Sequence, residues 1–599
     1  MEPEHRGFRD MVGLFEQAVE KFHRRPLFGT KQPDGTWQWM NYAEFNEHVQ
    51  TMRSALVSLG ISRGDRVACI SNNRYEWAVV AYATYGLGAA LVPMYEAQQS
   101  KDWHYILKDS EAKVLFVASL KLHQQVAGFK NDLSSLAHIA VFDAVSATDI
   151  LDYPTLHKQG HQTSKAPMYH PEPEELCTII YTSGTTGNPK GVKLSHSNIA
   201  SNVSALISIF PIAPEDRSLS FLSWAHVFGQ TVELHFLLAQ GASMGIAESV
   251  DTIVKNLTEV RPTLLFSVPR IFNRIFAAVH KKMDAEGGIK KTLFDAALSN
   301  AVKRRQLTAS HERSFMVEAK HAVFDWLVFR KVRDRFGGRL RYAFCGGAAI
   351  AKEVAEFIDD LGVMVYEGYG LTETSPVVTA NRPGARKLGS VGQVLPGVRV
   401  EIAKSEMPDS EDGEVIVYGH NVMQGYYKLP QEDAKIFTAD GGLRTGDLGH
   451  LDQQGFLYLT GRAKEHYKLE NGKFVSPEPL EEQLKLSPYI VSAMVYGLNR
   501  PYNVALIVVD MEALTAWAKQ QGVTHTDAGA LLRDSTVQEL YQNEIATRLS
   551  AARQYEKVQR CALIAEDFTT ANGMLTPSMK LKRRVVLARY GDMLNGLYP

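Results

Sequence analysis

A glycine- and hydroxyl-rich stretch of the chain reads Tyr181-Thr-Ser-Gly-Thr-Thr-Gly-Asn-Pro-Lys190-Gly191, directly after an apolar, strand-like run, Leu176-Cys-Thr-Ile-Ile180. Its glycines let backbone N–H groups approach an anion closely, its hydroxyls can donate hydrogen bonds, and Lys190 adds positive charge. No Gly-Lys-Ser/Thr opens a helix here, so the pattern differs from the common nucleotide-kinase loop. A flexible Ser/Thr/Gly surface loop is the alternative interpretation. We expect a phosphate-binding loop that follows a β-strand.

The composition is that of an ordinary globular protein too long for one hydrophobic core. Of its 599 residues, 45% are hydrophobic and 22% charged, so at least two domains are expected. The 65 basic and 66 acidic side chains nearly balance, which gives no reason to invoke nucleic acid as a partner. The four cysteines lack metal-ligand spacing and indicate buried, reduced thiols of a cytoplasmic protein. With no evident signal peptide and no run of ~18 apolar residues, any membrane contact is expected to be peripheral.

Strands and helices alternate along the first part of the chain. Arg66 to Ser71 reads as a buried strand and Glu76 to Leu87 as a helix, and a second cycle follows the glycine-rich stretch. This alternation predicts parallel sheets covered by helices. Over residues 399–460, short strands with glycine turns predict a small β-subdomain, and a compact α+β segment follows. We therefore expect a large domain over residues 1–462 and a small one over residues 463–599.

Residues 181–191 resemble the signature of the adenylate-forming superfamily, which includes acyl-CoA synthetases, firefly luciferase and the adenylation domains of peptide synthetases. Other segments resemble further motifs of that superfamily in the same order, and on them the chain is identified as a member. They are Arg341-Tyr-Ala-Phe-Cys-Gly-Gly-Ala-Ala349, Tyr366-Glu-Gly-Tyr-Gly-Leu-Thr-Glu-Thr374, Arg444-Thr-Gly-Asp-Leu-Gly449 and the run from Gly461 to Pro477. The resemblance implies an α/β fold: a large N-terminal domain of two αβ-layered subdomains plus a small β-subdomain, then a small mobile α+β domain.

The resemblance also implies a nucleotide site built from these blocks. In the superfamily the glycine-rich loop and a threonine bind phosphate, small residues and an aromatic ring line the adenine pocket, and a carboxylate and an arginine hold the ribose. The residues carried over are Thr182, Ser183, Gly184, Thr185, Thr186, Gly187, Lys190 and Thr372 for phosphate, Gly346, Gly347, Ala348 and Tyr369 with Gly370 for adenine, and Asp447 and Arg462 for ribose. Glu373 is the implied ligand of Mg²⁺, an ion that prefers few carboxylates plus phosphate oxygens. A tight turn at 346–348 and a helix cap at Thr372 are the alternatives.

Three further residues take roles from the resemblance. Lys580, in Leu575-Thr-Pro-Ser-Met-Lys580-Leu-Lys-Arg583, stands where the superfamily has a catalytic lysine that reaches into the larger domain, although Met579 replaces a common glycine and Lys582 is a second candidate. His226, in Ser223-Trp-Ala-His-Val-Phe-Gly229, is implied beside the substrate carboxylate; otherwise a lone histidine in an apolar run is usually structural. Lys464 occupies the hinge position, where backbone torsions absorb a domain rotation. A charged linker is the alternative there.

The Lys580 segment and a helical stretch over residues 281–335 resemble the long-chain acyl-CoA synthetase branch. The implied reaction uses ATP, Mg²⁺ and coenzyme A in two steps: a fatty acid carboxylate attacks the α-phosphate of ATP, and the coenzyme A thiol then displaces AMP from the acyl adenylate. Lys190, His226, Thr372 and Lys580 are the implied catalytic residues. The alternatives are activation of another acid, acyl transfer to a carrier protein, and an inactive scaffold that only binds.

The stretch 281–335 also differs from the rest of the chain in charge. It carries 13 Lys/Arg against 7 Asp/Glu in a protein that is otherwise neutral. Phe324, Trp326, Leu327 and Phe329 are expected on its helical faces. Because anionic lipid attracts basic segments and aromatic side chains anchor them, we expect this stretch to contact a membrane. The alternative is a solvated charged face whose aromatic residues pack into the core.

Overall fold

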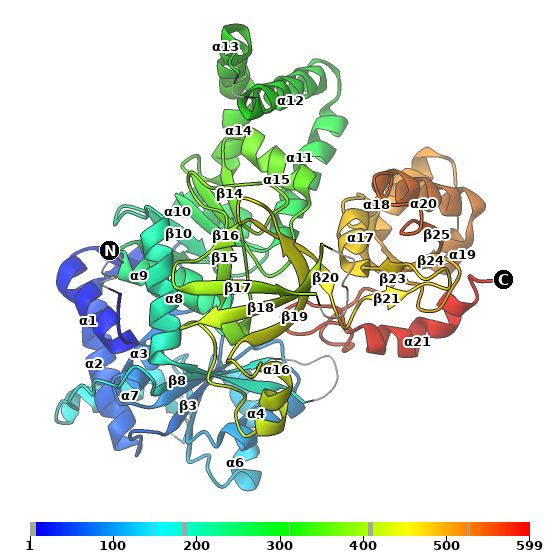
Figure 1. Ribbon diagram of the computed structural model, residues 1–599. Helices are drawn as coiled ribbons and strands as arrows, with labels where there is room; N and C mark the ends of the chain where they lie inside the picture. The colour runs from blue at the N-terminus through cyan, green and yellow to red at the C-terminus, as the bar shows by residue number, and fades with distance from the viewer. Residues whose placement is uncertain are drawn as a thin grey trace.

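The computed structural model describes residues 7–147, 149–182, 188–310, 312–404, 411–523, 525 and 527–599. Figure 1 shows a large body, a helical projection from it and a smaller C-terminal unit at its side. Among the described residues, no helix has both the length and the apolar character to cross a membrane. The four cysteines are free and buried, as the sequence predicts.

The N-terminal part of the body is layered around a seven-stranded sheet. Its spatial order is β7-β6-β5-β3-β4-β8-β9, and neighbours are parallel except for the β8–β9 hairpin. The strands are β3 (Arg66–Ile70), β4 (Ala90–Met94), β5 (Val114–Val117), β6 (His138–Val141), β7 (Leu151–Asp152), β8 (Leu176–Thr182) and β9 (Lys190–Ser195). Since helices cover both faces, strands such as β3 read as continuous apolar runs, and the predicted parallel sheet is confirmed.

A nine-stranded sheet forms the second layered subdomain. Its order is β16-β15-β14-β13-β12-β10-β11-β1-β2; the central strands from β14 to β1 are parallel, and antiparallel strands complete both edges. The strands are β1 (Pro26–Lys31), β2 (Trp37–Asn41), β10 (Arg217–Ser220), β11 (Ser243–Ile246), β12 (Leu264–Ser267), β13 (Tyr342–Cys345), β14 (Met364–Gly370), β15 (Val377–Ala380) and β16 (Gln393–Val394). N-terminal strands thus complete a sheet that is otherwise built from residues after 216.

Antiparallel strands make the expected β-subdomain, and the C-terminal unit is α+β. The subdomain has the order β17 (Val398–Ala403), β18 (Gly413–Gly419), β19 (Leu443–Leu451) and β20 (Leu457–Arg462). The C-terminal unit contains β21 (Tyr467–Lys468), β22 (Phe474–Val475), β23 (Ile490–Tyr496), β24 (Asn503–Val509) and β25 (Val558–Ile564). Most of its buried side chains form clusters of their own, and Leu486 packs into a cluster of the body.

Helices cover the sheets and form the projection. In the body they are α1 (Met11–Phe22), α2 (Tyr42–Ser58), α3 (Tyr75–Tyr85), α4 (Ser100–Ser110), α5 (Leu120–Val126), α6 (Phe129–Asp132), α7 (Tyr153–Gln162), α8 (His196–Ile209), α9 (Phe236–Ala239), α10 (Ile253–Val260), α15 (Lys352–Asp360) and α16 (Pro430–Ile436). The projection comprises α11 (Pro269–Glu286), α12 (Gly288–Ala309), α13 (Phe315–Phe324) and α14 (Arg330–Arg333). The C-terminal unit has α17 (Pro477–Leu484), α18 (Met511–Gln520), α19 (Ala528–Arg533), α20 (Ser535–Arg548) and α21 (Arg583–Asn595).

One helix of the body differs from an ordinary α-helix. Before α9 the chain forms a π-helix, Phe228–His235, which begins two residues after His226. Such wide turns are frequent at functional sites. The sequence periodicity did not show this, because buried apolar residues recur at similar spacing in both kinds of helix.

Candidate functional site

The β8–β9 hairpin frames the glycine-rich loop. Thr182 at the end of β8 pairs with Lys190 at the start of β9. The candidate residues between them, Ser183, Gly184, Thr185, Thr186 and Gly187, lie outside the described residues. Lys190 forms an ion pair with Glu432 of α16, with 2.5 Å between Nζ and Oε2, and lies 5.1 Å from the centre of the Tyr426 ring. The cation that follows the loop is therefore fixed against the segment that joins β18 to β19.

The carboxyl ends of β13 and β14 bring two candidate blocks to one edge of the second sheet. The strands are parallel neighbours, with Cys345 opposite Glu367. The turn Gly346–Ala348 leaves β13, with Gly347 at a φ of +85°, and Gly347 and Ala348 are exposed. Tyr369 and Gly370 end β14. In open α/β sheets ligands bind in the crevice beyond such strand ends.

Thr372 and Glu373 follow in a short 3₁₀ turn, Thr372–Thr374. Thr372 is buried, and Glu373 accepts a hydrogen bond of 2.8 Å at Oε1 from the Tyr426 hydroxyl. The ring of Tyr426 thus connects Glu373 to Lys190. Within the ranges that the structure describes, no group of three or more His, Cys, Asp or Glu side chains could enclose a metal ion. A lone carboxylate of this kind suits Mg²⁺ that takes its other oxygens from phosphate and water.

Gly370 has no room for a side chain, so a substitution there tests the packing at the carboxyl end of β14. A Cβ atom there would lie 1.7 Å from the Pro376 carbonyl oxygen, so Gly370→Ala should lower the free energy of unfolding by about 2 kcal/mol or more. Thermal melting measures this as a lower midpoint. Gly346→Ala is the control, because its Cβ would meet the Phe228 ring at 3.4 Å. If Gly370→Ala has the same melting midpoint as the wild type, the close contact between residue 370 and the Pro376 carbonyl is refuted.

Asp447, Arg462 and Tyr369 meet at the junction of the second sheet and the β-subdomain. Asp447 and Arg462 are opposite residues of β19 and β20, and Arg462 Nε lies 3.2 Å from Asp447 Oδ1. The Tyr369 hydroxyl donates a 2.7 Å hydrogen bond to Asp447 Oδ2. Burial, with the Asp447 charge beside it, raises the pKa of Tyr369 well above its ordinary value, so the hydroxyl stays a donor. These contacts hold a carboxylate, a guanidinium and an aromatic ring in fixed mutual positions.

Lys580 extends from the C-terminal unit to this group of residues. Its charge interacts with Arg462, Asp447 and Glu373 of the body, so the two units face each other here. Lys580 is an exposed residue, and desolvation by the surrounding protein, followed by the Arg462 charge, lowers the pKa of its ammonium. Met579 stands where the superfamily commonly has glycine. Its φ is +63°, a left-handed conformation that costs residues other than glycine about 1 kcal/mol.

His226 lies on the same side of the molecule as Lys580. It is partly buried, and its Nδ1 accepts a 3.2 Å hydrogen bond from the Phe228 amide. Enclosure, followed by the nearby charge of Lys580, lowers the pKa of His226 to about 4. The imidazole is therefore neutral near pH 7 and can receive a hydrogen bond or donate one without adding charge.

Lys464 is exposed in the turn between β20 and β21. The next residue, Glu465, forms an ion pair of 3.1 Å with Arg583, and Arg583 also pairs with Glu481 of α17 at 2.6 Å. Arg583 therefore connects the segment that carries Lys580 to the turn at Lys464.

Arg583, Tyr426 and Glu432 were not singled out from the sequence. The acidic first turn of a helix that starts with Pro430 signals a helix start, but not that Glu432 meets Lys190.

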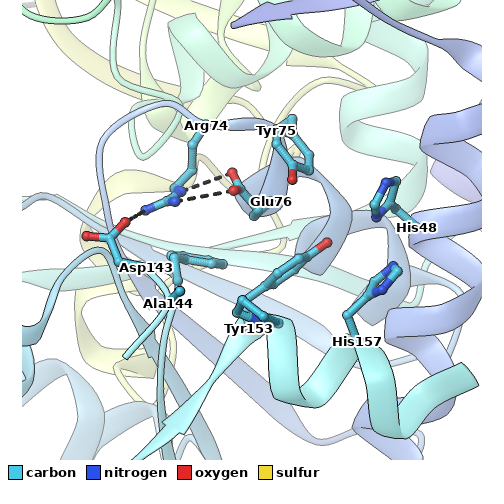
Figure 2. Close-up of a pocket in the computed structure, with 10 residues that line it drawn as sticks. His48, Arg74, Tyr75, Glu76, Asp143, Ala144, Tyr153 and His157 are labelled. Atoms are coloured by element: carbon cyan, nitrogen blue, oxygen red, sulfur yellow. Dashed lines mark hydrogen bonds and ion pairs between the residues drawn. The ribbon is translucent and has the colours of Figure 1, made fainter. Parts of the chain in front are cut away.

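A separate cavity of about 460 Å³ lies at the carboxyl ends of β3 and β6. Figure 2 shows Arg74 in it, directed toward Glu76 and Asp143. The guanidinium bonds to both carboxylates, at 3.0 and 2.9 Å, so its charge is already neutralised. His157, which also lines the cavity, has its pKa lowered to about 4 by burial and by His48. This cavity contains none of the candidate residues.

Comparisons with known proteins agree on one family. The chain matches the family model described as AMP-binding enzyme over residues 15–427 and the model described as AMP-binding enzyme C-terminal domain over residues 465–599. It is 33% identical to a long-chain-fatty-acid–CoA ligase of Mycobacterium bovis, covering 94% of this chain and 93% of that protein. It is 30% identical to long chain acyl-CoA synthetase 7, peroxisomal, of Arabidopsis thaliana, covering 100% of this chain and 87% of that protein. The adenylation domain of a carboxylate reductase from Mycobacterium chelonae has the same fold, with a TM-score of 0.80 and 22% identity over 98% of this chain and 91% of that one.

Proposed function

The chain belongs to the AMP-binding enzyme family, and we propose that it converts long-chain fatty acids to acyl-CoA thioesters by way of an acyl adenylate. The observation that carries the proposal is that Lys580 of the C-terminal unit faces Asp447, Arg462 and Glu373 of the body. Relatives that match nearly the whole chain are named for long-chain acids, and this supports the substrate class.

The first half-reaction needs a carboxylate and the α-phosphate of ATP brought together against their mutual repulsion. A carboxylate oxygen attacks the α-phosphorus, and the bond to pyrophosphate breaks. Lys190 and Thr372 bind phosphate oxygens in this proposal, and Lys580 stabilises the charge that develops at the centre, in the way that positioned cations lower such barriers. His226, neutral at pH 7, lies beside the fatty acid carboxylate without adding charge.

The nucleotide is held by the groups around Asp447. Tyr369 presents its ring to adenine beside the small residues Gly346, Gly347 and Ala348, and Asp447 accepts hydrogen bonds from the ribose. Arg462, 37% exposed at its side chain, bridges from Asp447 toward phosphate. Glu373 would hold Mg²⁺, which when bound neutralises charge on the phosphate oxygens. Tyr426 keeps the Glu373 carboxylate in place through its hydroxyl.

The second half-reaction needs Lys580 out of the way and a path for coenzyme A. We divide the chain at residue 462, so that the domain 463–599 turns about Lys464 while the domain 1–462 keeps the acyl adenylate. The thiol then attacks the acyl carbonyl, and AMP leaves. Arg583, through Glu465, couples this rotation to the withdrawal of Lys580. One mobile domain can in this way serve two reactions that need different groups at one centre.

The test of the proposal is product analysis with a panel of acids. We expect AMP, pyrophosphate and acyl-CoA to form in equal amounts with long-chain fatty acids, and much less with aryl, bile or short-chain acids. Transfer to a carrier protein in place of coenzyme A would favour the nearest alternative function. Absence of AMP release with every acid would leave only binding and reject the proposal.

Asp447→Asn gives a narrower test of the nucleotide site. The amide still accepts a hydrogen bond from Tyr369 but loses the charge that Arg462 and the ribose hydroxyls share. Hydrogen bonds to a charged group are stronger by about 1 kcal/mol, so KM for ATP should rise about fivefold. The KM for fatty acid should stay near that of wild type. Equal rises in both constants would show a general distortion and not a ribose contact.

The proposed location follows from the substrate. We place the enzyme in the cytoplasm, as a peripheral protein at the membrane face where long-chain acids partition. Its partners in this proposal are the fatty acid, ATP and coenzyme A, without nucleic acid.

A further inference from the structure

The helical projection is connected directly to the candidate site. We use the term arm for residues 269–333, from α11 to α14, which extend away from the body (Figure 1). The arm begins just after β12, whose last residue, Ser267, accepts a 3.3 Å hydrogen bond from the Gly346 amide. The start of the arm is thus adjacent to the turn Gly346–Ala348.

One side of α13 and of the π-helical turn Asp325–Phe329 that continues it is apolar and exposed. We define this apolar face by its six members, which recur at helical spacing and point to solvent. They are Phe315, Met316, Ala319, Ala322, Val323 and Trp326. Phe315 is 91% exposed, Met316 66% and Trp326 65%. Apolar side chains exposed together on one surface usually indicate a binding site.

The opposite side of the same helix packs against α12 of the arm. Val317, Val328 and Phe329 are buried there, and Phe324 and Leu327 are partly buried against a core cluster. The expectation that Phe329 is available for a membrane is therefore wrong, and Trp326 is the exposed aromatic residue among those named from the sequence. The reason is that the helix has apolar residues on two sides, so periodicity alone could not say which side faces solvent.

The charges beside the apolar face are positive. Lys320 lies beside Met316 and Val323 by α-helical spacing, and the exposed Arg330 directly follows the π-helical turn. Neither forms an ion pair with any other described residue. The acidic residues of this helix lie on other sides: Glu318 pairs with Arg304 at 3.0 Å, and Asp325 pairs with Arg333 at 2.6 Å. The face thus combines large apolar side chains with unpaired cations and has no carboxylate of its own.

We propose that the apolar face of the arm docks on the surface of a membrane that contains anionic lipid. Aromatic and aliphatic side chains at the tip of a helix enter the headgroup region, and flanking cations are attracted to lipid phosphates. A second copy of the chain fits less well, because a symmetric pairing of this face would bring Lys320 and Arg330 near their own copies. The inference extends the proposed function, because the docked arm would place the site close to the bilayer from which the acid comes.

Flotation with lipid vesicles tests the surface without depending on catalysis. The full chain is mixed with vesicles of phosphatidylcholine plus phosphatidylglycerol, or of phosphatidylcholine alone, at low and high salt. We expect flotation with the anionic vesicles at low salt, and a fall of about tenfold or more in bound protein for Phe315→Glu/Trp326→Glu and for Lys320→Glu/Arg330→Glu. Arg304 and Arg305 are left unchanged, because Arg304 pairs with Glu318 within the arm and Arg305 pairs with Asp360 of α15 in the body.

Val254→Glu is the matched control, because Val254 is 63% exposed on α10, outside the arm. It should float like the wild type, and all variants should melt with the wild type and release AMP normally from detergent-dispersed acid. An inactive wild type that floats would reject the ligase and leave the docking surface intact. The proposal is overturned if the wild type stays unbound or the arm variants float equally. It is also overturned if light scattering shows a dimer that Phe315→Glu/Trp326→Glu makes monomeric, since the face then joins two copies.

Discussion

Replacing Lys580 with alanine should slow acyl adenylate formation by about 10²–10³-fold, the usual cost of losing one transition-state charge contact. Thioester formation from supplied acyl adenylate and coenzyme A should persist, because the second half-reaction begins after Lys580 has been withdrawn. The first rate is measured by pyrophosphate release in a single turnover, and the second by the appearance of acyl-CoA. The split between the two rates follows from where Lys580 lies, facing Asp447, Arg462 and Glu373 of the other domain.

Lys582→Ala is the control for this experiment. Lys582 is the second basic candidate of the same segment and directly precedes α21, so its loss changes a similar charge at a neighbouring place. Both half-reactions should stay near wild-type rates. If Lys580→Ala slows both half-reactions equally, or if Lys582→Ala gives the larger loss of adenylation, the catalytic role belongs elsewhere.

Lys464→Pro should leave adenylation close to normal and suppress thioester formation by at least about tenfold, because proline fixes φ near −65° and prevents the domain rotation. The substitution removes a backbone N–H that makes no hydrogen bond to any described residue, so this conformation should tolerate it. The same two assays measure it. The difference from Lys580→Ala is the informative part, since the two variants should fail in opposite half-reactions.

Lys464→Ala is the matched control, because it removes the same side chain and keeps a free backbone. It should support both half-reactions at nearly wild-type rates. A proline variant that makes thioester as fast as the wild type would exclude Lys464 as the hinge. An alanine variant as slow as the proline variant would instead assign the effect to the side chain.

The places of the candidate residues could be predicted from the sequence because each block is local, a strand followed by a tight turn. β14 ends at Tyr369 and Gly370, and β3 spans Arg66–Ile70, close to the predicted strand from Arg66 to Ser71. Short-range hydrophobic pattern and glycine turns are sufficient for such segments. They also indicated the antiparallel β-subdomain, which places Asp447 opposite Arg462.

The contacts between blocks could not be predicted in the same way. Lys190 meets Glu432 across 242 positions of sequence, and Tyr426 meets Glu373 across 53. Which carboxylate reaches which cation depends on how the β-subdomain packs on the sheets, and no local pattern records that. The arm shows a related limit: α13 and the π-helical turn Asp325–Phe329 have apolar residues on two sides, and packing decides which of them are buried.

The most direct test of the central claim follows the oxygen atoms of the acid. The enzyme is given a long-chain fatty acid labelled with oxygen-18 in its carboxylate, together with ATP and coenzyme A, and the nucleotide product is analysed by mass spectrometry. An acyl adenylate requires that one carboxylate oxygen stay on the α-phosphate when the thiol attacks, so we predict AMP that carries one atom of oxygen-18. Label in inorganic phosphate with ADP as the product, or AMP without label, would contradict the account.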